Sequence, residues 1–265
     1  QALALLSAFR ANSQTDKHRP SLLVIPASLL GNWRQESQRF TPSLKLTFLH
    51  PAENSIETIE QIAADPIKKL AQTDLAITTY SMLARQDWLV KVNWRLVILD
   101  EAQAIKNPST SQSKAAKKLP AQSRIALTGT PVENRLGDLW SLFDFLNPGL
   151  LGSAAVFKSF VKNLQTRQQD QFAPLRQLVS PYILRRLKTD RTIIADLPEK
   201  IETLSYCKLG KTQIKLYETA VNTLKEKLKD VDGIARRGLV LQYLMRFKQL
   251  CNHPSQLPAM AAMTP

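Results

Sequence analysis

A pair of adjacent carboxylates is the strongest chemical feature of this chain. Asp100 and Glu101 follow the apolar run Leu96–Leu99, and Gln103 comes shortly after them. A buried parallel strand carries the residues at its carboxyl end to the edge where open α/β sheets bind ligands. One carboxylate there can hold a nucleotide-bound Mg²⁺ through water, and its neighbour can activate the attacking water. A solvated turn between a strand and a helix produces the same pair, so the pair by itself leaves both interpretations open.

A second apolar run ends in a turn rich in hydroxyl groups. Ile125–Leu127 is followed by Thr128, Gly129 and Thr130. The glycine allows a tight turn, and the two hydroxyls can donate and accept hydrogen bonds. Gln103 can also do both without titrating near neutral pH. We therefore expect Gln103 to link the acidic pair to these hydroxyls, although plain turn chemistry would explain the same residues.

Strand and helix signals alternate around these two segments. The strand-length apolar runs are residues 21–25, 45–49, 74–79, 95–99 and 124–128. The helix-like segments between them are residues 29–40, 56–70 and 109–119. Such alternation predicts a parallel α/β sheet over residues 1–146, without fixing the strand order. Within residues 29–40 we expect Trp33 and Phe40 to face inward. For Trp33, and for Trp140 later in the chain, packing in the core is favoured over stacking on nucleic-acid bases.

Helical signals replace strands after residue 148. Two apolar faces at helical spacing are expected there, made by Phe157, Phe160, Val161 and Leu164 and by Phe172, Leu175 and Leu178. Residues 201–209 read as an extended segment. Two longer apolar stripes, starting at Ile214 and at Val240, predict two helices that pack together.

Six blocks of sequence, in order, carry a family resemblance. They lie at residues 26–33, 78–80, 100–108, 127–148, 184–190 and 249–254. On these blocks the chain resembles the SWI/SNF-like branch of the superfamily 2 helicase-related ATPases. The block at 100–103 is similar to that group's second helicase motif in a Gln-ended form, and the block at 127–131 to its motif III. The blocks at 26–33 and 78–80 are similar to motifs Ia and Ib.

The resemblance implies a RecA-like parallel sheet flanked by helices, with an appended helical insertion and the helical start of a second lobe. We expect residues 1–148 to form lobe 1 without its P-loop and residues 149–196 to form the insertion and the return to lobe 1. Residues 197–265 are expected to begin lobe 2 with a helical insertion.

The resemblance also assigns roles within the nucleotide site. Asp100 is expected to hold Mg²⁺ through water and Glu101 to activate the hydrolytic water for ATP. Gln103 is expected to connect them to motif III, represented by Thr128, Gly129 and Thr130.

Nucleic-acid contacts are expected along the same edge of the sheet. Hydroxyls and backbone N–H groups of motifs Ia and Ib can contact phosphates without reading sequence. Basic or amide side chains after the acidic pair can add to this row of phosphate contacts, called the predicted track below. The arginine pair in block 184–190 could contact DNA or pair with acids between lobes. The expected residues are Pro26, Ser28, Thr78, Thr79, Lys106, Asn107, Arg185 and Arg186. Lys117 and Lys118 read as solvated.

A P-loop motif does not occur in the sequence. Such a loop needs Gly-x-x-x-x-Gly-Lys-Ser/Thr so that backbone N–H groups can wrap phosphates. The Gly-Lys-Thr at 210–212 lacks the first glycine and follows the acidic pair, so we interpret it as the start of a helix. The resemblance implies that the chain begins just after the P-loop and that the rest of lobe 2, with its arginine finger, follows residue 265. We expect no meaningful ATP turnover from these residues alone.

The charge and the cysteine content of the chain limit the kinds of binding partner that it can have. The 36 basic and 22 acidic residues leave a net charge of +14, which favours a polyanion such as nucleic acid. Two distant cysteines and three scattered histidines do not form a disulfide framework or a zinc motif. No apolar run approaches the roughly 20 residues that cross a bilayer, so no membrane partner is expected.

The leading hypothesis is an ATP-driven translocase on double-stranded DNA that remodels protein–DNA complexes. Its expected partners are duplex DNA, the second ATPase lobe and a DNA-bound protein complex. The alternatives are a strand-separating superfamily 2 helicase and a non-catalytic basic module that binds nucleic acid. A bacterial protein would work in the cytoplasm at the nucleoid, and a eukaryotic one in the nucleus.

Overall fold

The computed structural model describes residues 1–11, 19–129, 136–165, 172–186 and 201–257. The chain divides into two compact units, Gln1–Ile183 and Leu184–Pro265. The predicted domain boundary near residue 148 falls inside the first unit, and the one near residue 196 lies outside the described residues.

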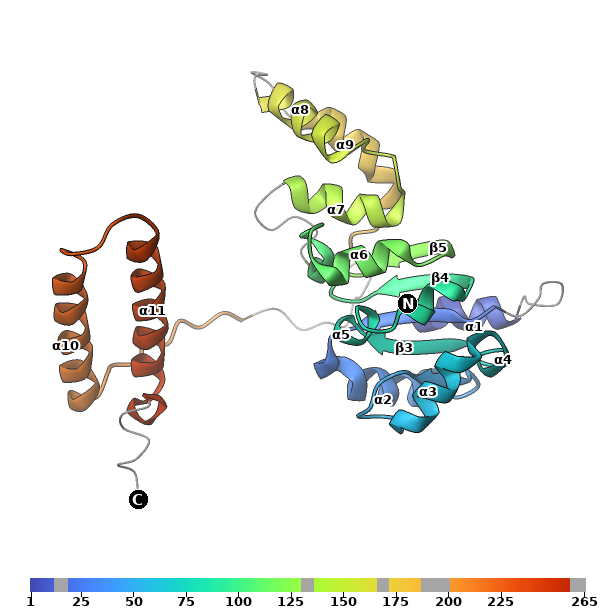
Figure 1. The fold of residues 1–265 in the computed structure, drawn as a ribbon, viewed down its shortest axis with the longest axis horizontal. Coiled ribbons are helices and arrows are strands. Elements are labelled where there is room, and N and C mark those ends of the chain that lie inside the picture. Colours follow the sequence, from blue (N-terminus) through green and yellow to red (C-terminus); the bar gives the residue numbers. More distant parts are fainter. Residues whose placement is uncertain (12–18, 130–135, 166–171, 187–200, 258–265) are drawn as a thin grey trace. The chain divides into compact units, whose positions relative to one another are not determined.

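A parallel sheet forms the centre of the first unit (Figure 1). Its strands are β1 (Ser21–Ile25), β2 (Leu46–Phe48), β3 (Leu75–Thr79), β4 (Trp94–Leu99) and β5 (Ala121–Ala126). The order is β2-β3-β1-β4-β5, with every neighbouring pair parallel. The structure thus confirms the predicted α/β class and supplies the strand order, which the sequence pattern could not.

Strand β5 begins three residues earlier than the apolar pattern suggested, at Ala121 rather than residue 124. It pairs with β4 along its whole length, from Trp94 opposite Ala121 to Leu99 opposite Ala126. Gln122 and Ser123 are exposed, because β5 is an edge strand. Polar side chains are acceptable on such an edge, and they hid the start of the strand from an apolar search.

Both faces of the sheet are covered, as expected for a parallel sheet. On one face, residues such as Val24 and Leu99 pack against α5 (Tyr80–Leu83), η2 (Asp87–Lys91), α6 (Ser111–Lys118) and α7 (Leu136–Leu146). On the other, residues such as Leu23 and Ile98 pack against α1 (Ala2–Ala11) and α2 (Leu30–Phe40). This division follows the two-residue period of a strand. Helix α3 (Ile56–Ala64) adds Ile62 to the core that contains Val24 and Leu99, and α4 (Pro66–Lys69) follows it in the chain.

Helix starts agree with local capping chemistry. Ser55, Asp65, Thr79 and Thr110 each accept a hydrogen bond from a backbone N–H in the first turn of α3, α4, α5 and α6, respectively. A cap of this type contributes about 1 kcal/mol to helix stability. One expectation in this region was wrong: Phe40 is 63% exposed, because it is the last residue of α2 and its side chain leaves the core.

Helices α8 (Ala154–Gln165) and α9 (Ala173–Val179) extend beyond α7 at the β5 side of the sheet (Figure 1). Phe157, Leu164 and Leu175 form a common core with α7, as the helical spacing predicted. Leu178 does not join that core, since Val179 occupies the buried position and Leu178 is exposed.

The second unit is built on α10 (Lys211–Lys227) and α11 (Gly233–Asn252). They pack through Ala220, Tyr243 and Leu250, which confirms the predicted helix pair. The predicted faces were wrong, since Ile214 and Val240, where the two apolar stripes were expected to start, are exposed. Gly210 immediately precedes α10 and its backbone N–H donates to the side chain of Gln213, so residues 210–212 do start a helix. Residues 201–209, which were expected to be extended, form neither a helix nor a paired strand. None of the described helices is long and apolar enough to span a membrane.

Candidate functional site

The carboxyl ends of the central strands meet at one edge of the sheet. The register places Ile25 of β1 opposite Thr79 of β3, and Val24 opposite Leu99 of β4. The backbone N–H of Asp100 then donates to the carbonyl of Val24 at 2.9 Å. The motif Ia, motif Ib and Asp-Glu segments therefore begin side by side, as the apolar runs predicted.

Asp100 is held by three hydrogen bonds from three different segments. Its Oδ1 accepts the backbone N–H of Glu101 at 2.9 Å, and its Oδ2 accepts the indole N–H of Trp33 at 2.8 Å. The hydroxyl of Tyr80 donates to its backbone carbonyl at 2.8 Å. The side chain is half-buried, so the carboxylate is fixed in orientation but still reached by solvent.

Glu101 adopts a left-handed backbone conformation, with φ 48° and ψ 53°. Among the residues that the structure describes, it is the non-glycine residue with positive φ. That conformation costs an ordinary residue about 1 kcal/mol. It turns the chain sharply between β4 and the short helix η3 (Ala102–Ile105). Backbone strain of this kind is concentrated at functional sites, where the surrounding structure holds the residue in the conformation that its role requires.

Gln103 connects Glu101 to the motif III segment. Its side-chain Nε2 donates to Oε2 of Glu101 at 2.6 Å, and its Oε1 accepts the hydroxyl of Thr128 at 3.1 Å. The backbone strengthens this link, since the N–H of Ala102 donates to the carbonyl of Leu127 at 2.9 Å. The structure thus brings together Asp100, Glu101, Gln103 and Thr128, while Thr130 lies outside the described residues.

Gly129 is exposed and does not need to be glycine on steric grounds. Its φ is not in the left-handed region, and a Cβ built there meets no described atom within 4 Å. The turn that Gly129 was expected to allow therefore does not depend on glycine at this position.

Trp33 and Tyr80 belong to the site although the sequence did not mark them as site residues. Trp33 packs against the α1–α2 face of the sheet, as expected, but its indole also reaches the acid 67 residues away in sequence. Tyr80 directly follows Thr79. Burial raises the pKa of Tyr80 well above its ordinary value, and the charges of Asp100 and Glu101 raise it further, so its hydroxyl remains a donor. The available signal was position, since Trp33 ends block 26–33 and Tyr80 ends block 78–80.

The predicted nucleic-acid residues fall into two groups by exposure. Ser28 is exposed beside the half-buried Pro26, on η1 (Ala27–Leu29) just before α2. Thr78 and Thr79 are buried instead. The Thr78 hydroxyl donates to the carbonyl of Leu49 at 3.4 Å, and that of Thr79 caps α5 by accepting the N–H of Met82. In this conformation neither threonine hydroxyl faces solvent.

The segment after η3 is exposed but firmly anchored. Lys106 and Asn107 are exposed, and the Asn107 side chain accepts the backbone N–H of Ser109 at 3.0 Å. Behind them, the carbonyl of Ile105 accepts the buried hydroxyls of Ser113 and Ser141. Arg185 and Arg186 are also exposed, and they belong to the second unit.

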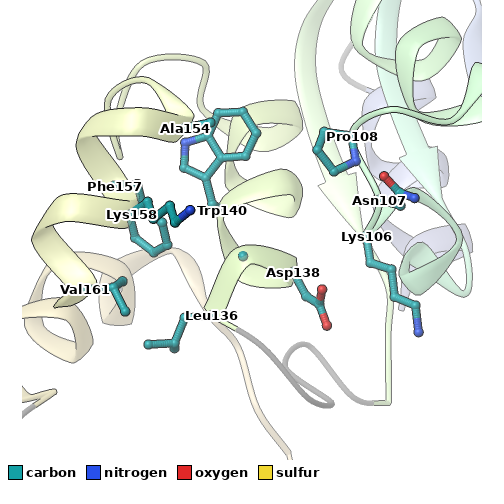
Figure 2. Close-up of a pocket in the computed structure, with 11 residues that line it drawn as sticks. Lys106, Asn107, Pro108, Leu136, Asp138, Trp140, Ala154, Phe157, Lys158 and Val161 are labelled. Carbon is teal, nitrogen blue, oxygen red and sulfur yellow. The ribbon is translucent and has the colours of Figure 1, made fainter. Parts of the chain in front are cut away.

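A pocket of about 800 Å³ lies between this anchored segment and the helices α7 and α8 (Figure 2). Lys106, Asn107 and Pro108 line one side. The helical side includes Trp140, whose indole donates to the carbonyl of Gly152, and Phe157. The pocket therefore combines an apolar wall with charged groups at its rim.

Lys117, near this region, was expected to be solvated, and that expectation was wrong. Its ammonium pairs with Asp144 at 2.8 Å, donates to Ser141 and lies over the Trp140 ring. Partners from α7 thus take this lysine out of solvent, while Lys118 is exposed as expected.

Residues 1–256 match the model of the SNF2-related domain. The chain belongs to this family. The solved SWI2/SNF2 ATPase core of Sulfolobus solfataricus, in complex with double-stranded DNA, matches 97% of the chain at 40% identity with a TM-score of 0.64. The chain covers 52% of that protein. These findings confirm the resemblance and the RecA-like lobe.

Curated relatives of this SNF2-related chain come from bacteria and eukaryotes. A putative ATP-dependent helicase/translocase of Bacillus subtilis, YwqA, is 39% identical over 89% of the chain. The TATA-binding protein-associated factor mot1 of Schizosaccharomyces pombe is 35% identical over 90% of the chain. The chain spans 25% and 13% of their lengths, respectively. It is thus an SNF2-family domain of the ATP-dependent helicase/translocase type, shared by much longer proteins.

Proposed function

We propose that this chain contributes to the first ATPase lobe of an enzyme that hydrolyses ATP in response to double-stranded DNA and moves along the duplex. One observation carries the proposal: hydrogen bonds connect Glu101 through Gln103 to Thr128, next to the oriented carboxylate of Asp100. This is the arrangement expected if hydrolysis at the acids is coupled to a neighbouring segment of the sheet edge.

Asp100 fits a water-mediated ligand of Mg²⁺. Each carboxylate oxygen accepts one hydrogen bond from the protein, so each keeps a lone pair for a metal-bound water. When bound, Mg²⁺ neutralises negative charge on the phosphates of ATP during transfer. The protein's part is to hold the carboxylate at the sheet edge in one orientation.

Glu101 is placed to orient and deprotonate the attacking water. Its left-handed backbone turns the chain directly after β4, and Gln103 holds one of its carboxylate oxygens. Gln103 does not titrate, so this contact is maintained over the working pH range. The hydroxyl of Thr128 binds the side chain of Gln103, so a movement of either residue shifts the other. This contact connects the motif III segment physically to the catalytic carboxylate.

Duplex DNA is the proposed polyanion. The net charge of +14 favours such a partner, and the S. solfataricus relative was solved on double-stranded DNA. The exposed Ser28 and Lys106 are the described residues of the predicted track best placed for phosphate contact. Thr78 and Thr79 would contribute through the position of their backbone, and Arg185 and Arg186 either to DNA or to acids between the lobes.

Remodelling of a DNA-bound protein complex is the proposed outcome of movement. Its support is the relationship to mot1, whose name records association with the TATA-binding protein. The second ATPase lobe and a P-loop are proposed to complete the enzyme, together with ATP and Mg²⁺. We place the protein at the nucleoid in a bacterial cell or in the nucleus of a eukaryotic one.

The test uses the full-length protein with three substrates. ATP hydrolysis is measured with and without blunt duplex DNA, release of a triplex-forming third strand reports movement, and strand separation is followed on a forked duplex. The proposal expects DNA-stimulated hydrolysis and third-strand release without strand separation. Efficient unwinding would instead indicate a strand-separating helicase, and duplex binding without any hydrolysis would indicate a non-catalytic module. Residues 1–265 alone are expected to show no turnover.

A further inference from the structure

Two side-chain donors hold Asp100, and each comes from a segment predicted to contact DNA. Trp33 lies in the first turn of α2, which directly follows the short helix η1 with its exposed Ser28. Tyr80 begins α5, directly after the buried end of β3. The indole binds the carboxylate at 2.8 Å and the phenol binds the backbone carbonyl of the same residue at 2.8 Å. One contact therefore restrains the side chain of Asp100 and the other restrains its backbone.

We infer that Trp33 is a positioning residue, which orients the Asp100 carboxylate for metal-nucleotide binding and couples that carboxylate to the placement of the η1–α2 segment on DNA. This inference rests on the proposed function and goes beyond it by naming the physical contact that transmits the DNA signal. Tyr80 supports the same acid from the β3–α5 side.

The geometry makes Trp33 more than a core residue. Packing against the α1–α2 face restrains the half-buried ring, which limits how far the indole N–H can follow the carboxylate if Asp100 rotates. A shift of the start of α2 must therefore move or break the bond to Oδ2. Hydrogen bonds to a charged group are among the stronger ones in proteins, and this one is half-buried, where its strength is less reduced by water.

Trp33→Phe is the informative variant, because it removes the N–H donor and keeps an aromatic ring for packing. Trp140→Phe is the matched control, since it also deletes an indole N–H that donates to an oxygen, here the carbonyl of Gly152 between α7 and α8. Thermal melts of both variants check that the fold is intact.

The first readout is binding, without turnover. A fluorescent non-hydrolysable ATP analogue is titrated onto the full-length protein at varied Mg²⁺ concentration. In Trp33→Phe the half-saturating Mg²⁺ concentration should rise about tenfold, the factor that loss of one charge-assisted hydrogen bond carries. Trp140→Phe should match wild type. An unchanged Mg²⁺ requirement in Trp33→Phe, or an equal shift in both variants, would overturn the inference.

The second readout is coupling. If Trp33 transmits the DNA signal, duplex DNA lowers the Mg²⁺ requirement of the analogue-bound wild type. Mg²⁺ then tightens DNA binding by the analogue-bound protein by the same factor, because linkage is reciprocal. Trp33→Phe should lose this mutual effect while keeping its DNA affinity in the absence of nucleotide. Persistence of the full mutual effect in Trp33→Phe would contradict the inference.

Failure of the inference can be told apart from failure of the proposed function. If wild type shows neither Mg²⁺-dependent nucleotide binding nor DNA-stimulated hydrolysis, the proposed function fails and the inference falls with it. If wild type shows both and Trp33→Phe behaves as Trp140→Phe does, only the inference fails. Should Trp33→Phe not fold, Tyr80→Phe, which deletes one hydroxyl, is measured in the same way and is expected to weaken the mutual effect.

Discussion

The hydroxyl of Thr128 donates a 3.1 Å hydrogen bond to the side-chain oxygen of Gln103, joining the ends of β5 and β4 across the sheet edge. Because the nitrogen of the same amide holds Glu101, one neutral side chain links the motif III segment to an acid. This pairing gives the Gln-ended form of the second motif a physical role that a residue titrating near neutral pH would fill only in one protonation state.

Thr128→Val should uncouple this link with little effect on folding. The valine keeps the shape of the side chain but cannot donate to Gln103, so Glu101 is less firmly held. We expect the DNA-stimulated hydrolysis rate of the full-length protein to fall about tenfold, the value of one lost hydrogen bond near the reacting group. Thr223→Val on α10, which removes a hydroxyl bonded to a backbone carbonyl, is the control. Equal rates for both variants would show that the link is not functional.

The left-handed backbone of Glu101 predicts an unusual order of stability for two variants. Glycine adopts φ 48° without the steric cost that a Cβ imposes on alanine, so Glu101→Gly should be about 1 kcal/mol more stable than Glu101→Ala. At Glu60, inside α3, the order should be reversed by a similar amount, because glycine is a poor helix former. Chemical denaturation measures both differences. The same order at both sites would contradict the assigned backbone of Glu101.

Tyr80→Phe should change how stability depends on alkaline pH. Burial, with the charges of Asp100 and Glu101, raises the pKa of Tyr80 in the folded protein above that of an unfolded chain, which is about 10. The stabilisation from this group is therefore complete below pH ~10 and is lost as pH rises towards the folded pKa. Relative to Tyr80→Phe, wild type should lose unfolding free energy from pH ~10 upward. A difference that stays constant up to pH ~11 would rule out the raised pKa.

Ser113 and Ser141 should show non-additive effects on stability. Both buried hydroxyls donate to the carbonyl of Ile105, at 3.2 and 2.7 Å, so either one alone leaves that carbonyl with a partner. Each single alanine variant should cost about 1 kcal/mol, and the double variant clearly more than the sum. Exposed Ser43→Ala is a control expected to be neutral. Strict additivity in denaturation measurements would contradict a shared acceptor.

Much of the fold followed from local patterns, because the strands are short apolar runs with abrupt polar ends. That pattern placed Asp100 and Glu101 at a sheet edge correctly, and helical spacing identified Phe157, Leu164 and Leu175 as core. The strand order could not be obtained this way, since register is decided by pairing between distant segments. The polar start of β5 was missed for a related reason, because only the edge position makes Gln122 and Ser123 acceptable there.

The site was predicted less completely than the fold. Residues adjacent in sequence to a strand end were found, whereas Trp33 was recognised as a core residue but not as a partner of Asp100, because its contact spans 67 residues. Lys117 was misjudged for the same reason, since Asp144 and Trp140 come from a later helix. Thr78 and Thr79 were expected to offer hydroxyls to phosphates, but their position at the end of a central strand buries them.

The most direct test of the central claim compares ATP hydrolysis by the full-length protein with that of Glu101→Gln, each with and without duplex DNA. Glu60→Gln on α3, where the side chain is exposed, is the matched control. We expect strong stimulation by duplex in wild type and in Glu60→Gln, and a loss of at least about a hundredfold in Glu101→Gln with DNA binding retained. Wild-type rates in Glu101→Gln would contradict the role of Glu101 and the catalytic interpretation of the sheet edge.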